Sequence, residues 1–355
     1  MLLKLNSIII YGLWAFFLAL ALYPVYIMLL KKWKVGKTIR EETITGEKAT
    51  IFVNLHKHKT GTPNLGWGMF LIIMAIMIGL SLILQHYDII NNSLISRQET
   101  YIILFWFFSM GILGLIDDYL NVKWHGKIKW LSAKAKLIGM FFIAGFISRF
   151  FYSRLWIDYI NLRPIAGKIN LGIFYPIITF FITVSIVNAI NITDGLDWLA
   201  GWLMTIILLT MAIATFFYQT YIATTVIVIV IAVLLAFLRY NINPAKIFMG
   251  DSGAFALWWL LASLIYILNM RMWVLIPFIG IFAIFIAETG SSALQIFRKK
   301  VWKKKLFSVA PLHHMYEKAW HKETSIVMKA WLIQWILAAI TMIAIFYQFN
   351  IPLLP

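Results

Sequence analysis

Long runs of apolar residues, separated by short polar and charged stretches, dominate the chain. The hydrocarbon core of a bilayer is about 30 Å thick, and roughly 20 apolar residues cross it as an α-helix. With charges and turn residues taken as boundaries, this pattern predicts ten membrane-spanning helices. They are expected at 8–30, 65–84, 99–116, 135–152, 173–191, 196–217, 220–238, 254–270, 273–297 and 325–349. The predicted fold class is an all-α polytopic integral membrane protein, with residues 1–355 forming a single domain.

The composition agrees with this pattern. Hydrophobic residues make up 62% of the chain and charged residues only 13%, whereas a soluble domain carries about 25% charged residues. A water-soluble protein is therefore excluded. Cysteine is absent, which excludes disulfides, thiolate metal sites and a cysteine nucleophile. Pro164, Gly167 and Gly172 interrupt the segment 153–172, which we expect to form a small hairpin on the outer membrane surface.

The charges indicate how the helices are oriented. The chain has 31 Lys and Arg against 14 Asp and Glu, a net charge of +17. Most of the basic residues fall in 31–64, 117–136, 239–253 and 298–324. Loops rich in Lys and Arg stay in the cytoplasm, so these four segments are predicted to be cytoplasmic and both termini extracytoplasmic. The positive charge is explained by topology, and we expect no nucleic-acid partner.

Polar residues gather at the predicted cytoplasmic helix ends. The third span ends at Asp117-Asp118, and the fifth runs from Asn188 and Asn191 into Asp194-Gly195-Leu-Asp197. The seventh leads through Asn241 to Phe248-Met249-Gly250-Asp251, and the ninth is followed by lysines and then Pro311-Leu-His313-His314. Charges at the depth of the bilayer are costly and are usually functional. Four such clusters on one face predict one site at the membrane–water interface.

Each cluster also has a structural explanation. Asp117 and Asp118 could be solvated charges that end a helix, and Asp194-Gly195 could be an ordinary turn. A Gly-flanked aspartate such as Asp251 is common turn chemistry, and a histidine pair is more often structural than catalytic. Taken together, however, the clusters match phosphoryl transfer. Carboxylates and substrate phosphates are the ligands of Mg²⁺, and phosphoryl transfer depends mainly on positioning and charge neutralisation.

The order of these motifs resembles that of a known family. The chain reads Lys59-Thr-Gly-Thr62-Pro63-Asn-Leu-Gly66, then Ile116-Asp117-Asp118-Tyr119, then Leu131-Ser-Ala-Lys134-Ala-Lys136. It continues with the Asn188–Asp197 and Asn241–Asp251 segments and ends with Ala310-Pro-Leu-His313-His314. It resembles the phospho-N-acetylmuramoyl-pentapeptide transferases (translocase I), within the polyprenyl-phosphate N-acetylhexosamine-1-phosphate transferase superfamily. The resemblance implies a ten-helix protein of the bacterial cytoplasmic membrane with its active site on the cytoplasmic face.

The resemblance also implies an activity. UDP-MurNAc-pentapeptide would donate phospho-MurNAc-pentapeptide to undecaprenyl phosphate, with Mg²⁺ as cofactor, giving lipid I and UMP in peptidoglycan synthesis. It implies that Asp251 binds the metal and that Asp117 and Asp118 position or deprotonate the lipid phosphate, with His313 and His314 also catalytic. The implied substrate-binding residues are Lys59, Lys136, Asn188, Asn191, Asp194, Asp197, Asn241 and Phe248. The resemblance also allows a homodimer.

Two positions depart from the family pattern. The third histidine of a His-His-His run is replaced by Met315, and a glycine is replaced by Trp67. These departures leave the sugar and peptide preference open. They therefore leave a UDP-GlcNAc:undecaprenyl-phosphate transferase of the same superfamily as the alternative.

Two further questions also stay open at this point. A covalent aspartyl-phosphate route competes with direct attack by the lipid phosphate. A transporter of a lipid-linked sugar is the alternative outside the enzymes, although transporters bind substrate near the bilayer midplane between repeats. Glu288, which lies deep in the ninth predicted span, has no assigned role.

Overall fold

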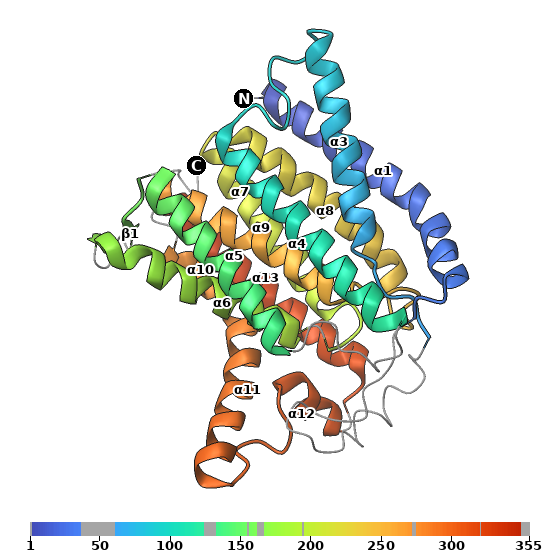
Figure 1. Cartoon of the computed structure of the whole chain (residues 1–355), viewed down its shortest axis with the longest axis vertical. Helices are drawn as coiled ribbons and strands as arrows, with labels where there is room; N and C mark the ends of the chain where they lie inside the picture. The colour runs from blue at the N-terminus through green and yellow to red at the C-terminus, as the bar shows by residue number, and fades with distance from the viewer. Residues whose placement is uncertain are drawn as a thin grey trace.

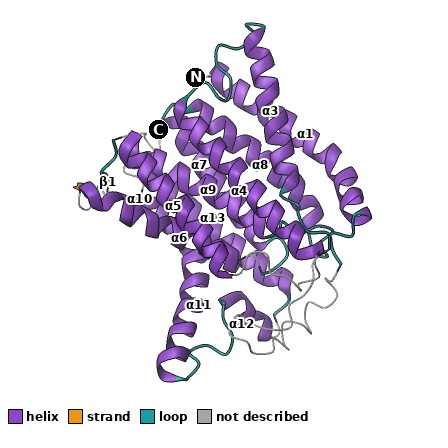
Figure 2. Cartoon of the chain, viewed as in Figure 1, coloured by secondary structure: helices purple, strands orange, loops and turns teal. Residues whose placement is uncertain are grey.

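The structure, a computed structural model, describes residues 2–36, 61–123, 133–154, 156–161, 167–193, 195–271, 275–319 and 321–348. Nearly all of this part of the chain is helical (Figure 2). The helices are α1 (Leu2–Lys32), α3 (Gly68–His86), α4 (Gln98–Lys123), α5 (Ala133–Arg154), α6 (Tyr175–Thr193), α7 (Leu199–Phe217), α8 (Tyr221–Asn241), α9 (Asp251–Arg271), α10 (Leu275–Ile281), α11 (Ala283–Trp302), α12 (Leu312–Lys318) and α13 (Glu323–Gln348). The all-α prediction is confirmed.

The long helices pack side by side in one bundle (Figure 1). The most extensive contacts join α4 with α9, α1 with α8, α7 with α8, and α5 with α6. Glycines allow several of these close approaches. A Cβ atom at Gly12 on α1 would lie 2.7 Å from Val228 of α8, and one at Gly201 on α7 would lie 2.8 Å from Leu238 of α8. As a result α8 packs closely between α1 and α7, and most of its side chains are buried.

Five helices are long and apolar enough to cross a membrane, by length and composition within the described residues. They are Lys4–Lys32, Gly68–His86, Leu199–Phe217, Tyr221–Asn241 and Glu323–Tyr347, and they correspond to the first, second, sixth, seventh and tenth predicted spans. Two shorter apolar helices, Thr100–Ile116 and Gly172–Ser185, overlap the third and fifth predicted spans. The protein is a multi-pass membrane protein.

The predicted hairpin is present. β1 (Tyr159–Asn161) pairs with β2 (Lys168–Asn170) in antiparallel register, with Ile160 opposite Ile169. The backbone amides of Leu171 and Gly172 both donate to the carbonyl of Asp158, which closes the base of the hairpin. Gly172 adopts a positive φ of 52° there, a conformation that glycine accepts without strain.

The ninth predicted span, 273–297, is not one straight helix. It breaks at Phe282, between α10 and α11. The fully buried side chain of Gln334 on α13 donates from Nε2 to the carbonyl of Ile281 at 2.9 Å, so the carbonyl beside the break is satisfied inside the bundle. Beyond the break, α11 extends away from the long helices of the bundle, and α12 lies beside it (Figure 1).

Candidate functional site

The first part of the site is a set of loops joined by backbone hydrogen bonds. Pro63 pairs with Gly36 in an isolated β-bridge just after α1. On its other side, the Pro63 carbonyl accepts from the amide of Phe248 at 2.8 Å, and the Phe248 carbonyl accepts from Gly66 at 2.9 Å. The tyrosine hydroxyl of Tyr26 on α1 donates to the Leu65 carbonyl at 2.8 Å. The ends of α1, α3 and α9 are thus held together at one end of the bundle.

Asp118, on the last turns of α4, is directed at this set of loops. Its side chain is buried, and a Cβ atom at Gly250 would lie 2.5 Å from its Oδ2. Gly250 has a φ of +86°, so both its conformation and the space available require glycine. The next residue, Asp251, begins α9. The absence of a side chain at Gly250 therefore lets the backbone before Asp251 approach the Asp118 carboxylate.

Asn64 adds a second oxygen group beside Gly250. The same added Cβ atom would lie 3.1 Å from Asn64 Oδ1. This oxygen is buried and has no hydrogen-bond partner within the described part of the chain. A carboxylate and an unsatisfied amide oxygen next to one glycine are the donor chemistry that Mg²⁺ prefers, so these residues fit the predicted metal.

Asn241, the last residue of α8, joins the loop that contains Gly250 to the loop that precedes α7. Its side-chain Oδ1 accepts from the amide of Trp198 at 3.0 Å, and its Nδ2 donates to the carbonyl of Ile247 at 2.9 Å. The 195–198 loop and the 247–250 loop are therefore fixed to each other by one buried amide. Asn241 was expected to bind substrate, and in the structure its side-chain amide hydrogen-bonds to the backbone of Trp198 and Ile247.

Asp197 lies in a network of acidic groups and one amide. Asn243 Nδ2 donates to Asp197 Oδ2 at 3.0 Å and to Glu323 Oε2 at 3.3 Å. The backbone amide of Asp197 donates to Glu323 Oε1 at 2.6 Å. Sequence reasoning missed Asn243 and Glu323. The only available signal for Glu323 was an acidic residue at the start of a span beside a basic segment, and that position is also favourable for a helix N-terminus.

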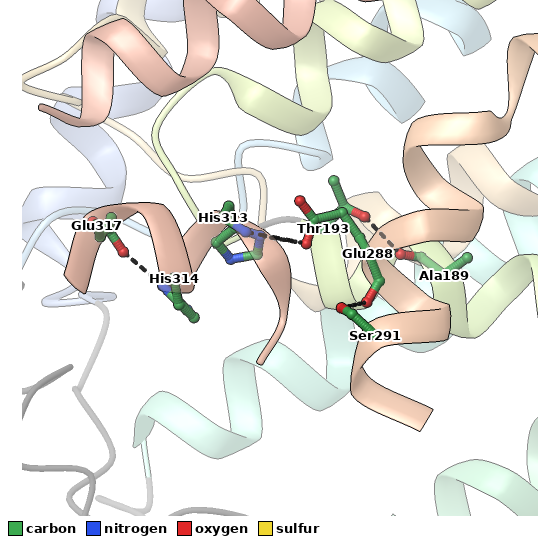
Figure 3. Close-up of polar contacts among 7 residues, drawn as sticks. All are labelled: Ala189, Thr193, Glu288, Ser291, His313, His314 and Glu317. Carbon is green, nitrogen blue, oxygen red and sulfur yellow. Dashed lines mark hydrogen bonds and ion pairs between the residues drawn. The ribbon is translucent and has the colours of Figure 1, made fainter. Parts of the chain in front are cut away.

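His313, one of the histidine pair, lies next to the 195–198 loop. His313 is buried on α12, and its Nδ1 lies 3.0 Å from Oε2 of Glu288 on α11, as Figure 3 shows. A carboxylate oxygen can only accept, so Nδ1 carries the proton and Nε2 is left as an acceptor. A side chain at Gly195 would collide with His313 Nε2, which places that nitrogen against the Asp194–Asp197 segment. His314 Nδ1 lies 2.6 Å from Glu317 Oε2.

Burial lowers the pKa of His313 below its ordinary value. His314 lowers this pKa further, whereas the hydrogen bond to Glu288 and the charge of Glu317 act in the opposite direction. The imidazole is therefore neutral at neutral pH, in agreement with the acceptor role of Nε2.

The structure brings several of the expected residues together at one end of the bundle: Asp118, Phe248, Asp197, Asn241, His313 and His314. For Asp117, Lys136, Asn188, Asn191 and Asp251 only the backbone is described, on α4, α5, α6 and α9. Lys59 and Asp194 lie outside the described residues.

The two departures from the family pattern have different surroundings. Trp67 is fully buried and stacks on Phe70 with ring centroids 4.3 Å apart. Its indole fills space next to Gly111 of α4, where a Cβ atom would lie 2.7 Å from Trp67 Nε1. Trp67 therefore contributes to the core between α3 and α4. Met315 lies on α12, one residue after His314.

Comparison with known proteins identifies the family. The family described as Glycosyl transferase family 4 matches residues 100–269. Three proteins named phospho-N-acetylmuramoyl-pentapeptide-transferase are similar over most of the chain. The one from Thermoanaerobacter sp. (strain X514) is 33% identical over 97% of this chain and 98% of its own length. The one from Clostridium perfringens (strain SM101 / Type A) is 34% identical over 88% and 89%. The one from Staphylococcus saprophyticus subsp. saprophyticus is 35% identical over 90% and 93%.

Sequence similarity of this extent and coverage, together with the polar site at one end of an apolar bundle, establishes the class of protein. The chain is a membrane-embedded transferase that belongs to the phospho-N-acetylmuramoyl-pentapeptide-transferase family.

Proposed function

We propose that the protein transfers phospho-MurNAc-pentapeptide from UDP-MurNAc-pentapeptide to undecaprenyl phosphate, releasing UMP and forming lipid I. The observation that carries this proposal is the approach of Asp118 to Gly250, directly before Asp251. It gathers the motifs of α4 and α9 around one point at the end of an apolar bundle. A site there is accessible both to a water-soluble nucleotide and to a lipid whose phosphate stays at the membrane surface.

The reaction is direct displacement at phosphorus. An oxygen of undecaprenyl phosphate attacks the sugar-linked phosphorus of the donor, a new pyrophosphate bond forms, and the bond to the UMP oxygen breaks. A phosphate monoester has a second pKa near 6 and is largely dianionic at neutral pH, so no strong base is needed. Asp118 therefore serves to position the acceptor phosphate, together with Asp117. Asp251 is proposed to hold Mg²⁺ with oxygen donors of Asp118 and Asn64. Bound Mg²⁺ neutralises negative charge on transferring phosphates.

The remaining residues are proposed to hold the donor. Asp194, Asp197, Asn191, Asn188 and Phe248 would contact the uridine and the diphosphate, and Lys59 and Lys136 would pair with phosphates. Asn243 supports this arrangement because its amide lies between Asp197 and Glu323, where it separates two acidic groups. Asn241 holds the loop that carries Asp197 against the loop that carries Phe248. Both are positioning residues.

The membrane topology proposed from the charge pattern is ten spans with both termini outside and the site facing the cytoplasm of a bacterial cell. The absence of cysteine makes this easy to test. Single variants Tyr87→Cys and Ser308→Cys lie in exposed positions on opposite predicted sides. An impermeant thiol reagent added to intact cells should label the first and spare the second. The reverse pattern would contradict the topology.

The function is tested with purified protein, undecaprenyl phosphate and Mg²⁺. UDP-MurNAc-pentapeptide should give UMP and a lipid-linked product, whereas UDP-GlcNAc should give neither. Asp251→Ala should abolish transfer while the protein still unfolds at a normal temperature. Equal turnover of UDP-GlcNAc would favour the alternative transferase. Exchange of labelled UMP into the donor without any lipid phosphate would favour the covalent route.

A further inference from the structure

The end of α11 carries a surface that the catalytic proposal does not use. Leu294, Phe297 and Val301 follow one another at helical spacing and are all more than half exposed. Trp302 is exposed as well, and its ring lies edge-on to Phe297 with centroids 5.7 Å apart. Residues spaced in this way share one face of a helix. The end of α11 therefore presents an apolar, partly aromatic stripe.

Positive charge surrounds this stripe. Lys300 and Lys303–Lys305 are exposed, and Arg298 precedes them in the sequence. No Asp or Glu occurs in the sequence between Glu288 and Glu317. We call Phe297, Lys300, Val301, Trp302 and Lys303–Lys305 the basic tip. Its charge is of one sign and its apolar residues are large, which is the pattern of a segment that lies in the headgroup region of a membrane.

The shape of the basic tip is fixed by one side chain. Gln295 Oε1 accepts from the backbone amides of Leu306 at 2.8 Å and Phe307 at 2.9 Å, and its Nε2 donates to the Phe307 carbonyl at 2.9 Å. Lys303 takes a left-handed conformation with φ 55°, and its amide donates to Lys299. The chain thus turns back on α11 directly after Trp302, so the three lysines are held at a defined place on the helix end.

We propose that the basic tip is a docking site for anionic phospholipid headgroups of the leaflet that α11 meets. Trp302, Phe297 and Val301 would enter the boundary between headgroups and acyl chains, and the lysines would pair with lipid phosphates. The positive charge of the basic tip favours an anionic lipid over a zwitterionic one, because the negative potential of an anionic membrane surface stabilises nearby basic side chains. Figure 1 shows the end of α11 extending beyond the long helices of the bundle, with α12 on one side of it, and the exposed stripe is the part of its surface proposed to meet lipid.

The test uses the full-length protein reconstituted in bilayers of phosphatidylcholine and phosphatidylglycerol. Quenching of Trp302 by each lipid in brominated form gives the local preference, with Trp302→Phe supplying the signal of the other tryptophans. The wild type should prefer phosphatidylglycerol, and added salt should weaken the preference. In the triple variant Lys303→Gln, Lys304→Gln, Lys305→Gln, the preference for phosphatidylglycerol should fall by a factor of about ten or more, since each lysine contributes roughly a factor of five at the surface.

Two controls keep the result interpretable. The triple variant Lys31→Gln, Lys32→Gln, Lys34→Gln removes three exposed lysines at the end of α1, and it should leave the preference at Trp302 unchanged. Replacing Lys303, Lys304 and Lys305 by Arg keeps the charge and should keep the preference. Equal quenching of the wild type by both lipids would overturn the proposal, and so would a glutamine variant of the tip that keeps its preference.

Discussion

The Nδ1 atom of His313 lies 3.0 Å from Oε2 of Glu288, and both side chains are buried. The same carboxylate oxygen lies 3.4 Å from the backbone amide of His313. Glu288 therefore holds the ring of His313 in one orientation and in one protonation state, with Nε2 against Gly195. Sequence analysis assigned no role to Glu288, which lies deep in a predicted span. The geometry predicts that it is a positioning residue that acts through His313 on the 195–198 loop.

Replacing Glu288 should therefore affect catalysis through His313. Glu288→Ala should lower kcat/KM by on the order of 10- to 100-fold, as losses of orienting partners do, because His313 loses the carboxylate that accepts from its Nδ1. Glu288→Gln should retain most of the activity, since its amide oxygen can still accept from Nδ1. Steady-state kinetics with varied donor concentration measure this. If both variants were equally impaired, the positioning role would be wrong.

The stability of the protein should fall as the pH is lowered through the ordinary histidine range, and His313 should be one cause. Because burial lowers the pKa of His313, the unfolded chain binds the proton at a higher pH, near 6.5. The unfolded state then carries more protons, so the free energy of unfolding decreases as the pH falls below that value. Thermal unfolding in detergent from pH 8 to pH 5.5 measures the effect. His313→Gln should flatten the curve, and an unchanged slope would contradict the assignment.

Gly250→Ala should inactivate the enzyme. Its Cβ atom would lie 2.5 Å from Asp118 Oδ2, and a φ of +86° costs a non-glycine residue about 1–2 kcal/mol. Asp118 or the start of α9 would have to move. A Cβ atom at Gly79 on α3 would meet nothing within 4 Å, so Gly79→Ala is the matched control and should keep full activity. Assays of transfer at saturating substrates compare the two variants.

Trp67→Gly restores the residue expected from the family pattern, and it should change stability rather than specificity. The buried indole stacks on Phe70 and lies 5.1 Å from Phe107, measured between ring centroids. Its removal leaves a cavity that costs about 3–5 kcal/mol for a side chain of this size. The unfolding temperature should drop while the preference for UDP-MurNAc-pentapeptide over UDP-GlcNAc stays the same. A shifted donor preference with unchanged stability would instead place Trp67 in substrate selection.

Hydropathy alone predicted most of the fold, because apolar runs long enough to cross a bilayer leave little choice of structure. The hairpin between Tyr159 and Asn170 was also predictable from its glycines and proline. The break at Phe282 was not. At the break, Gln334 of α13, which is far away in the sequence, donates a hydrogen bond to the Ile281 carbonyl. A local pattern contains no information about such a tertiary contact.

The residues of the candidate site also fall into two groups, those that sequence motifs reveal and those that only the folded structure reveals. Asp118, Asp197, His313 and Phe248 belong to recognisable motifs, and their convergence was predicted from the parity of the spans. Asn64, Asn243 and Glu323 act through contacts that form only in the folded chain. Single polar residues of this kind carry no spacing signal. The pairing of Glu288 with His313 likewise joins two helices and could not be read from either.

The double hydrogen bond made by Asn241 has a consequence for how the two ligands bind. This one amide joins the loop of Asp197, which is proposed to contact the donor, to the loop of Gly250, beside which Asp118 is proposed to position the acceptor phosphate. A ligand that immobilises one loop reduces the entropy that remains to be lost when the other becomes ordered. Binding of the donor should therefore raise the affinity for the acceptor. By linkage, binding of the acceptor must raise the affinity for the donor by the same factor.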